Sequence, residues 1–135
     1  MNYWLVKTEP SVYSWDDLRK AKSAVWDGVK NPVALKNLRA ARRGDPVLIY
    51  HTGAEKRVVG IAEVSREAYP DPKKLDERLL VVDLVAREKL ETPVPLQILR
   101  KEAAFADSPL LCIGRLSVVP LDERQWKTVL KLAAG

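Results

Sequence analysis

The residues best suited to chemistry lie in the segment WDGVKN, residues 26–31. Trp26 offers a flat π-face on which a base can stack, and such stacking contributes about 1–3 kcal/mol per base. Asp27-Gly28 is a turn signal that brings Trp26 and Lys30 close together in space. Two structural roles compete with this interpretation. Trp26 is as suited to core packing, and Asn31, which precedes a proline, is suited to capping a helix.

A strongly basic segment follows directly. No acidic residue occurs from Gly28 to Gly44, although this stretch contains five basic ones. Within the helix predicted here, Lys36, Arg39 and Arg43 are spaced i, i+3 and i+7, so they are expected to line one exposed face. Such a face can bind phosphates. The competing interpretation is a helix face made basic for solubility alone.

Two further polar clusters follow predicted strands. Lys7 and Thr8 belong to KTEP, residues 7–10, and a second cluster lies in YHTG, residues 50–53, which contains Tyr50, His51 and Thr52. A lysine is costly to bury without a partner, and a single histidine on a strand is more often structural than functional. If these clusters and WDGVKN converge on one cleft, they form a binding site.

The sequence gives little support for catalysis. It contains none of the common nucleotide-binding, hydrolase or metalloprotease motifs, and it has one histidine and one cysteine. A Ser/His/Asp triad needs only one histidine and stays open, but we expect no catalytic residues, no metal and no cofactor. Cys112 lies in the apolar segment LLCIG, which predicts a buried, inert thiol.

The length, composition and net charge of the chain are those of a compact soluble protein. The chain has 135 residues, 47% of them apolar and 30% charged, with a net charge of +5 that is compatible with a nucleic-acid partner. We expect one domain over residues 1–135. No apolar run approaches the roughly 20 residues of a membrane helix, and the N-terminus lacks a signal peptide, so the predicted location is cytoplasmic and without a membrane partner. The predicted oligomeric state is a monomer.

The chemistry-bearing residues must be positioned by a mixed set of elements. Helices are predicted from Ser14, as N-cap, to Ala21, from Pro32 to the end signal at Gly44, and after Asp122. Short helical pieces are predicted within 92–109. Strands are predicted over 3–8, 46–52, 57–69, 78–88 and 114–120, and Gly60 suggests a bulge or a close backbone approach. Strands in the middle of the chain and helices at both flanks predict an α+β fold with a curved, partly closed sheet.

Several motifs in fixed order resemble the EVE domain of the PUA-like superfamily, which includes the thymocyte nuclear protein family. They are YWLVKTEP, WDGVKN, LRAARRGDPVLIYHTG, VVGIAEVSREAYPD and GRLSVVPL, and they cover nearly the whole chain. The family usually has serine at Thr8 and arginine at Lys30, and many members have Tyr-Gln-Ala-Arg where this chain has residues 32–35. The resemblance implies a PUA-like β-pseudobarrel, a curved and partly closed mixed sheet surrounded by short helices.

The resemblance also implies a ligand. EVE domains are similar in fold to YTH domains, which read methylated adenosine in an aromatic cage, and are thought to read modified cytosines in DNA. On that pattern Trp26 forms a cage wall, Lys7 and Thr8 line the pocket, and Asn31 binds the base edge. Tyr50, His51 and Thr52 lie at the rim or floor, and Val29 and Lys30 complete the pocket. The expected function is a non-catalytic reader that flips a methylated-cytosine-like base out of DNA while Lys36, Arg39 and Arg43 grip phosphates.

Two alternatives stay open at this point. The first is a module that binds modified RNA or a free nucleotide, which nothing in the sequence separates from a DNA reader. The second is a small amidohydrolase acting on a modified nucleoside, similar to some ASCH domains of the same superfamily. Its site would need a lysine, a hydroxyl and a carboxylate close together, and Lys7, Thr8 and Glu63 are the candidates.

Overall fold

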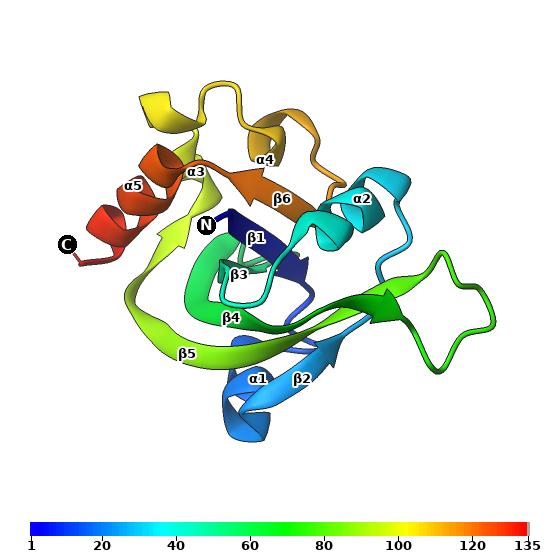
Figure 1. The fold of residues 1–135 in the computed structure, drawn as a ribbon. Helices are drawn as coiled ribbons and strands as arrows, with labels where there is room; N and C mark the ends of the chain where they lie inside the picture. Colours follow the sequence, from blue (N-terminus) through cyan, green and yellow to red (C-terminus); the bar gives the residue numbers. More distant parts are fainter. Residues whose placement is uncertain (135) are drawn as a thin grey trace.

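The computed structural model describes residues 1–134, which form one mixed six-stranded sheet and several short helices (Figure 1). The strand order is β2-β5-β4-β3-β1-β6, with β1 parallel to β3 and every other pair antiparallel. The sheet curves strongly through its two longest strands, β4 and β5, but its edges β2 and β6 do not pair, so it does not close. The predicted α+β class with a partly closed sheet is confirmed. The strands are β1 Tyr3–Thr8, β2 Ser23–Trp26, β3 Pro46–His51, β4 Arg57–Pro70, β5 Leu80–Pro95 and β6 Val118–Leu121.

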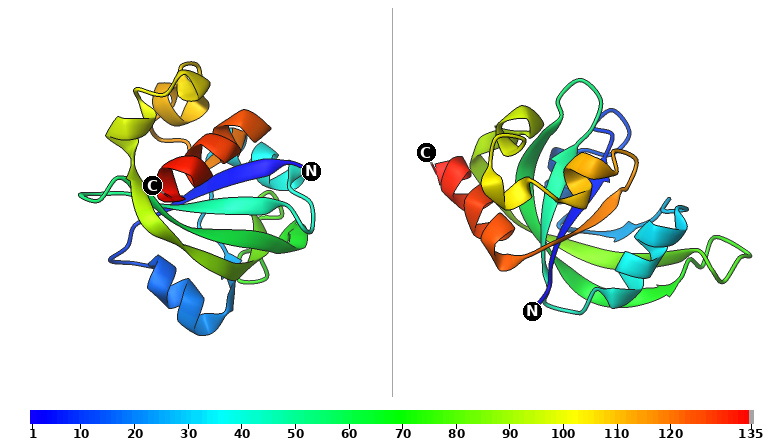
Figure 2. Two further views of the ribbon diagram at one scale, coloured as in Figure 1. Left: turned by 90° about the vertical axis from the view of Figure 1, so that its left-hand side faces the viewer. Right: turned by 90° about the horizontal axis from the view of Figure 1, so that it is seen from above.

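Helices surround the sheet (Figure 2). Their bounds are α1 Trp15–Ala21, α2 Pro32–Ala40, α3 Leu96–Leu99, α4 Pro109–Cys112 and α5 Glu123–Ala134, with a 3₁₀ turn at Ala103–Phe105. The core between sheet and helices is apolar, and Leu5, Leu48 and Phe105 are completely buried in it. Within residues 1–134, no helix is both long enough and apolar enough to cross a membrane.

Reciprocal caps fix two of the three helices that were predicted from their start signals. The Ser14 hydroxyl accepts the N–H of Asp17 at 3.1 Å, and the Asp17 carboxylate accepts the N–H of Ser14 at 2.8 Å. Asp122 and Gln125 repeat the arrangement at the start of α5, at 2.7 and 2.9 Å. Both helix starts are therefore confirmed.

The basic helix is shorter than predicted. We expected it to reach Gly44, but α2 ends at Ala40. Ala41 is buried in an extended conformation, and the Asp45 carboxylate accepts the N–H of Arg42 at 2.9 Å, which folds residues 42–45 into a turn. Arg43 therefore lies in this turn and does not share a helix face with Lys36 and Arg39.

One further expectation is wrong, and one strand was not predicted at all. Cys112 is exposed, because α4 is only four residues long and buries Leu110, leaving Cys112 and Ile113 on the outside. Strand β2 was not predicted, because its four residues, SAVW, alternate between exposed and buried positions too briefly to give a pattern. This edge strand matters, since its last residue is Trp26.

Gly60 lies both at a bulge and at a close approach to its backbone, the two features that were predicted as alternatives for it. The register of β3 and β4 shifts between Ile49 and Tyr50, and that of β4 and β5 shifts between Val58 and Gly60. The ring of Trp15 also lies so close that a Cβ at Gly60 would come within 2.5 Å of its Cδ2 and Cε3 atoms. Glycine here allows the first residue of α1 to pack directly on the sheet.

Gly60→Ala is expected to destabilise the protein by about 1–3 kcal/mol, because the buried Trp15 ring must shift to make room. Thermal unfolding followed by circular dichroism measures this. Gly114→Ala is the matched control, since no atom lies within 4 Å of its Cβ position. Equal melting temperatures for the Gly60 variant and the parent would contradict the packing argument.

Candidate functional site

Two of the three predicted polar clusters line one cavity. Its volume is about 430 Å³, and it lies between the end of β1, the loop that follows, strand β2 and the turn after it. The lining residues are Lys7, Thr8, Val12, Tyr13, Ala24, Val25, Trp26, Asp27 and Gly28. KTEP and WDGVKN, 19 residues apart at Lys7 and Trp26, therefore contribute to the same site.

Trp26 forms a wall of this cavity from within the core. It pairs with Val82 of β5, and only 7% of the residue is exposed. Gly28 follows with φ 78°, a left-handed conformation that glycine adopts without strain and that turns the chain away from the sheet. The indole is thus a rigid wall held by packing, with less free surface than an open stacking platform has.

Tyr13 is the aromatic partner that the sequence analysis missed. Its ring lies edge-on to Trp26, with centroids 6.1 Å apart and an interplanar angle of 81°. Burial and the nearby Asp17 carboxylate raise the pKa of Tyr13, so its hydroxyl stays protonated near neutral pH. The signal was present in the sequence, because Tyr13 follows KTEP by three residues, but only the fold brings it against Trp26.

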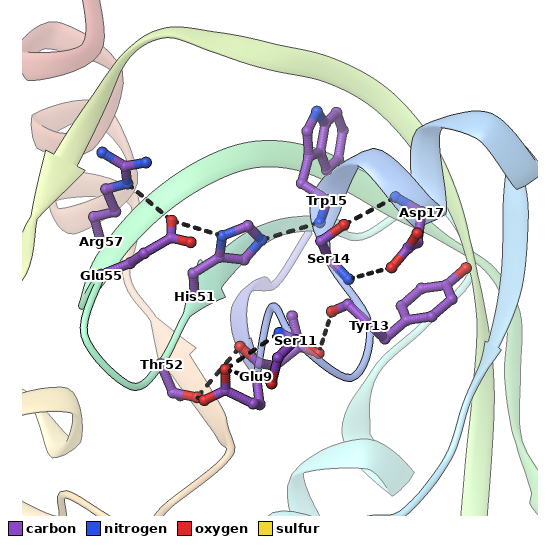
Figure 3. A network of polar contacts seen from close by, with 11 residues as sticks. Glu9, Ser11, Tyr13, Ser14, Trp15, Asp17, His51, Thr52, Glu55 and Arg57 are labelled. Carbon is purple, nitrogen blue, oxygen red and sulfur yellow. Dashed lines mark hydrogen bonds and ion pairs between the residues drawn. The ribbon is translucent and has the colours of Figure 1, made fainter.

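Thr8 fixes the loop that carries Tyr13. Its hydroxyl donates to the backbone oxygen of Tyr13 at 2.6 Å, and the backbone oxygen of Thr8 accepts the N–H of Thr52 at 2.9 Å (Figure 3 shows Tyr13 and Thr52 in the surrounding network). The hydroxyl that KTEP shares with the family's usual serine therefore positions one wall of the cavity.

Lys7 is the half-buried cation of the site. Its Nζ donates to the backbone oxygen of Gly114 at 3.0 Å and lies 5.7 Å from the centre of the Tyr50 ring. Burial lowers the pKa of Lys7, because removing the ammonium group from water disfavours its charge. Within residues 1–134 it forms no ion pair at 4 Å or less. An ammonium group has three donors, so two remain for a ligand.

The other predicted pocket residues lie outside this lining. Val29 is buried in the core and Lys30 is exposed. The Asn31 side chain accepts the N–H groups of Val33 and Ala34 at 2.8 and 3.2 Å, which makes it the N-cap of α2. Tyr50 is buried beneath Lys7, and Thr52 contacts the backbone of Thr8. Of these residues, Tyr50 and Thr52 contact residues that line the cavity.

His51 lies beside a separate cavity of about 360 Å³. Its Nε2 accepts the N–H of Trp15 at 3.0 Å, so the ring proton sits on Nδ1 and is donated to Glu55 at 3.0 Å (Figure 3). Both ring nitrogens are therefore engaged, and neither is free to activate a hydroxyl. Among residues 1–134 no three His, Cys, Asp or Glu side chains group as metal ligands.

The three residues nominated for an amidohydrolase do not come together. Lys7 and Thr8 pair with Tyr50 and His51 at one end of β3, whereas Glu63 pairs with Pro46 at the other end. Four residues of strand separate these levels by about 13 Å. Glu63 instead pairs with Arg87 at 2.8 Å. The carboxylate in that proposal was therefore misplaced.

The basic residues stay exposed around α2. Lys36 and Arg39 project from the helix opposite its buried residues Ala34, Leu35 and Leu38. Arg43 is exposed in the turn that follows the helix. Helix α2 begins six residues after Trp26, so the cavity wall and the basic surface are parts of one continuous segment.

The fold is a PUA-like α+β fold, and its cavity has two aromatic walls and a half-buried lysine. Residues 2–132 match the EVE domain, and the chain belongs to the EVE domain family. It is 28% identical to mouse thymocyte nuclear protein 1 over 165 residues, covering 97% of this chain and 73% of that protein. That relative is named for the nucleus, and the cytoplasmic location expected from the sequence stays a prediction.

Solved structures of other proteins have a similar fold. Rpa0253 from Rhodopseudomonas palustris has a TM-score of 0.91 at 43% identity, with 99% of this chain and 94% of that one covered. Human THYN1, solved in complex with 5-methylcytosine-containing DNA, has a TM-score of 0.87 at 25% identity, with 100% and 99% covered. The YTH domain of Zygosaccharomyces rouxii MRB1, solved with N6-methyladenosine RNA, has a TM-score of 0.59 at 15% identity and covers 98% and 86%, which confirms the predicted relation in fold.

Proposed function

We propose that this protein is a non-catalytic reader that binds a methylated-cytosine-like base, flipped out of duplex DNA, in the cavity between Tyr13 and Trp26. The main support is the meeting of two aromatic walls and a half-buried lysine in one cavity of about 430 Å³. The human relative supports the ligand class, since it was solved with 5-methylcytosine DNA and aligns over the whole of this chain.

The polar groups of the cavity complement a cytosine edge. Cytosine presents a carbonyl oxygen and a ring nitrogen as acceptors and an exocyclic amine as a donor. Lys7 supplies donors, and the Asp27 carboxylate is an acceptor in the same lining. A 5-methyl group needs an apolar surface, which Val12, Ala24 and Val25 offer. In this proposal Lys7, Thr8 and Trp26 contact the base, and Tyr50 and Thr52 contact Lys7 and Thr8 from behind. The other residues predicted for the pocket lie outside its lining and make no contact with the base: Val29, Lys30, Asn31 and His51.

Phosphate contacts come from the segment after the cavity. Lys36, Arg39 and Arg43 are exposed and follow the Trp26 wall directly in the chain. Such contacts fix the position of the protein on DNA without reading sequence. They also add the affinity that offsets base extrusion, which costs a few kcal/mol.

Titration of the protein with DNA duplexes at several salt concentrations tests both the preference for a methylated base and the phosphate contacts. A duplex with one 5-methylcytosine should bind more tightly than the unmodified duplex, and three phosphate contacts predict a log–log salt slope of about −2.7. The double variant Lys36→Gln/Arg39→Gln should lower this slope by about 1.8 while keeping the preference for the methylated base.

The outcomes also separate the alternatives. Equal affinity for methylated and unmodified duplexes would refute the base reader. Tighter binding to RNA with the same modified base would instead indicate a 2′-hydroxyl contact and an RNA ligand. Competition by the free nucleotide at similar concentrations would show that the phosphate contacts contribute nothing.

A further inference from the structure

Among residues 1–134, Leu75 is the most exposed large apolar residue, and it lies in a loop that projects from the body of the protein. Residues 71–79 connect β4 to β5 and extend away from the sheet (Figure 1). Leu75 is fully exposed, at 107% of the reference area. Single exposed apolar residues are ordinary on protein surfaces. Leu75 differs because its loop is ordered and because of where the loop lies.

The loop is held in shape by two aspartates on either side of Leu75. Asp71 is buried, its carboxylate accepts the N–H of Lys73 at 2.9 Å, and its backbone oxygen accepts the N–H of Lys74 at 3.1 Å. Asp76 accepts the N–H and the guanidinium of Arg78 at 2.9–3.0 Å. Leu75 is thus presented between two turns with their own hydrogen bonds.

The strands below the loop are also braced. The Tyr69 hydroxyl donates to Asp83 across β4 and β5 at 2.5 Å, and the Arg66 guanidinium stacks 3.8 Å from the centre of the Tyr69 ring. A cross-strand hydrogen bond together with a cation–π contact resists bending of the hairpin. The strands from which the loop projects are therefore fixed relative to one another.

The loop leaves the sheet beside the end of β2 that carries the cavity wall. Trp26 pairs with Val82, which is two residues from the start of β5, where the loop ends. Figure 1 and the right-hand view of Figure 2 both place the loop on the side of the molecule where α2 lies. A ligand that extends from the cavity past α2 would lie on the side of the molecule from which this loop projects.

Two lysines directly before Leu75 are suited to phosphate contacts. Lys73 and Lys74 precede it and form no ion pair within residues 1–134, whereas Arg78 is neutralised by Asp76. Residues 71–79 contain three acids and three bases, so the loop as a whole is neutral. The acids Asp76 and Glu77 follow Leu75, and Asp76 is paired with Arg78, so the positive charge lies on the side of Lys73 and Lys74. Lysines beside an apolar tip resemble the combination by which proteins insert apolar wedges between base steps.

We propose that Leu75 is the wedge that enters duplex DNA where the modified base leaves the stack. An extruded base leaves a gap between its neighbours, and an apolar side chain that fills the gap offsets part of the lost stacking. Lys73 and Lys74 bind the phosphates beside this step. This inference rests on the proposed function, because a wedge is needed only when the base starts inside a duplex.

The test compares Leu75→Ala with the parent on one 5-methylcytosine oligonucleotide, as a duplex and as a single strand. We expect about tenfold weaker binding to the duplex, equivalent to about 1.4 kcal/mol, and unchanged binding to the single strand, which needs no extrusion. A mismatch opposite the modified base should reduce the loss, because the base is then easier to extrude. Ile98→Ala, at an exposed residue of α3, is the matched control.

The outcomes distinguish this proposal from the one on which it rests. Equal losses on duplex and single strand, or no loss on either, would overturn the wedge and leave the base reader intact. A parent protein that does not prefer the methylated base in either form would overturn both. Leu75 is fully exposed, so we expect Leu75→Ala to melt at the same temperature as the parent. An unchanged melting temperature would show that the loss of duplex binding does not come from unfolding.

Discussion

Trp26→Leu is expected to weaken binding of 5-methylcytosine DNA by roughly 5- to 150-fold. The variant removes the indole face, and base–aromatic stacking contributes about 1–3 kcal/mol. Leucine retains much of the apolar burial, so we expect destabilisation of about 1–3 kcal/mol, which leaves the protein folded. Fluorescence anisotropy with a labelled duplex measures the affinity, and thermal unfolding shows that the variant is folded.

Trp126→Leu is a suitable control, because it removes the same ring elsewhere. Trp126 lies on α5 and packs against Tyr3 at a centroid distance of 5.2 Å, and it does not line the cavity. Its DNA affinity should equal that of the parent. A folded Trp26 variant that binds methylated DNA as tightly as the parent would rule out the indole as a base-binding wall.

Much of the fold could be predicted because local signals agree with the tertiary structure. Ser14, Asn31 and Asp122 are N-cap residues both by sequence and by their hydrogen bonds. The end of α2 could not be predicted in this way. Gly44 is a valid end signal, but the helix stops earlier, because Ala41 is buried in an extended conformation and Asp45 captures the N–H of Arg42.

The site was predicted in part for a related reason. Lys7, Thr8 and Trp26 share a cavity as their motifs suggested, and the motifs alone did not indicate Tyr13. His51 has an N–H donor and a carboxylate on its two ring nitrogens, contacts that span 36 and 4 residues. A residue's role depends on such partners, and spacing along the chain does not reveal them. The exposed fraction of Trp26 likewise depends on partners distant in the chain, because Trp26 pairs with Val82 of β5 and packs against the Tyr13 ring.

Asp45 is the clearest case of a partner that the sequence conceals. In RRGD it resembles an exposed turn residue, yet it is only 4% exposed. Its carboxylate accepts the indole N–H of Trp4 at 3.0 Å and the backbone N–H of Arg42 at 2.9 Å, and more weakly that of Asn2 at 3.3 Å. It therefore ties the turn after α2 to the first strand, 41 residues away.

Asp45→Ala is expected to destabilise the protein by about 2–4 kcal/mol, because it leaves the buried indole N–H of Trp4 and the partly buried backbone N–H of Arg42 without an acceptor. Urea denaturation measures this free energy. Asp45→Asn keeps one acceptor oxygen and should lose less. Asp16→Ala is the control, since Asp16 makes only an exposed ion pair with Arg19, and the loss should stay below about 1 kcal/mol. An Asp45→Ala variant as stable as the Asp16 variant would show that the N–H groups find water instead.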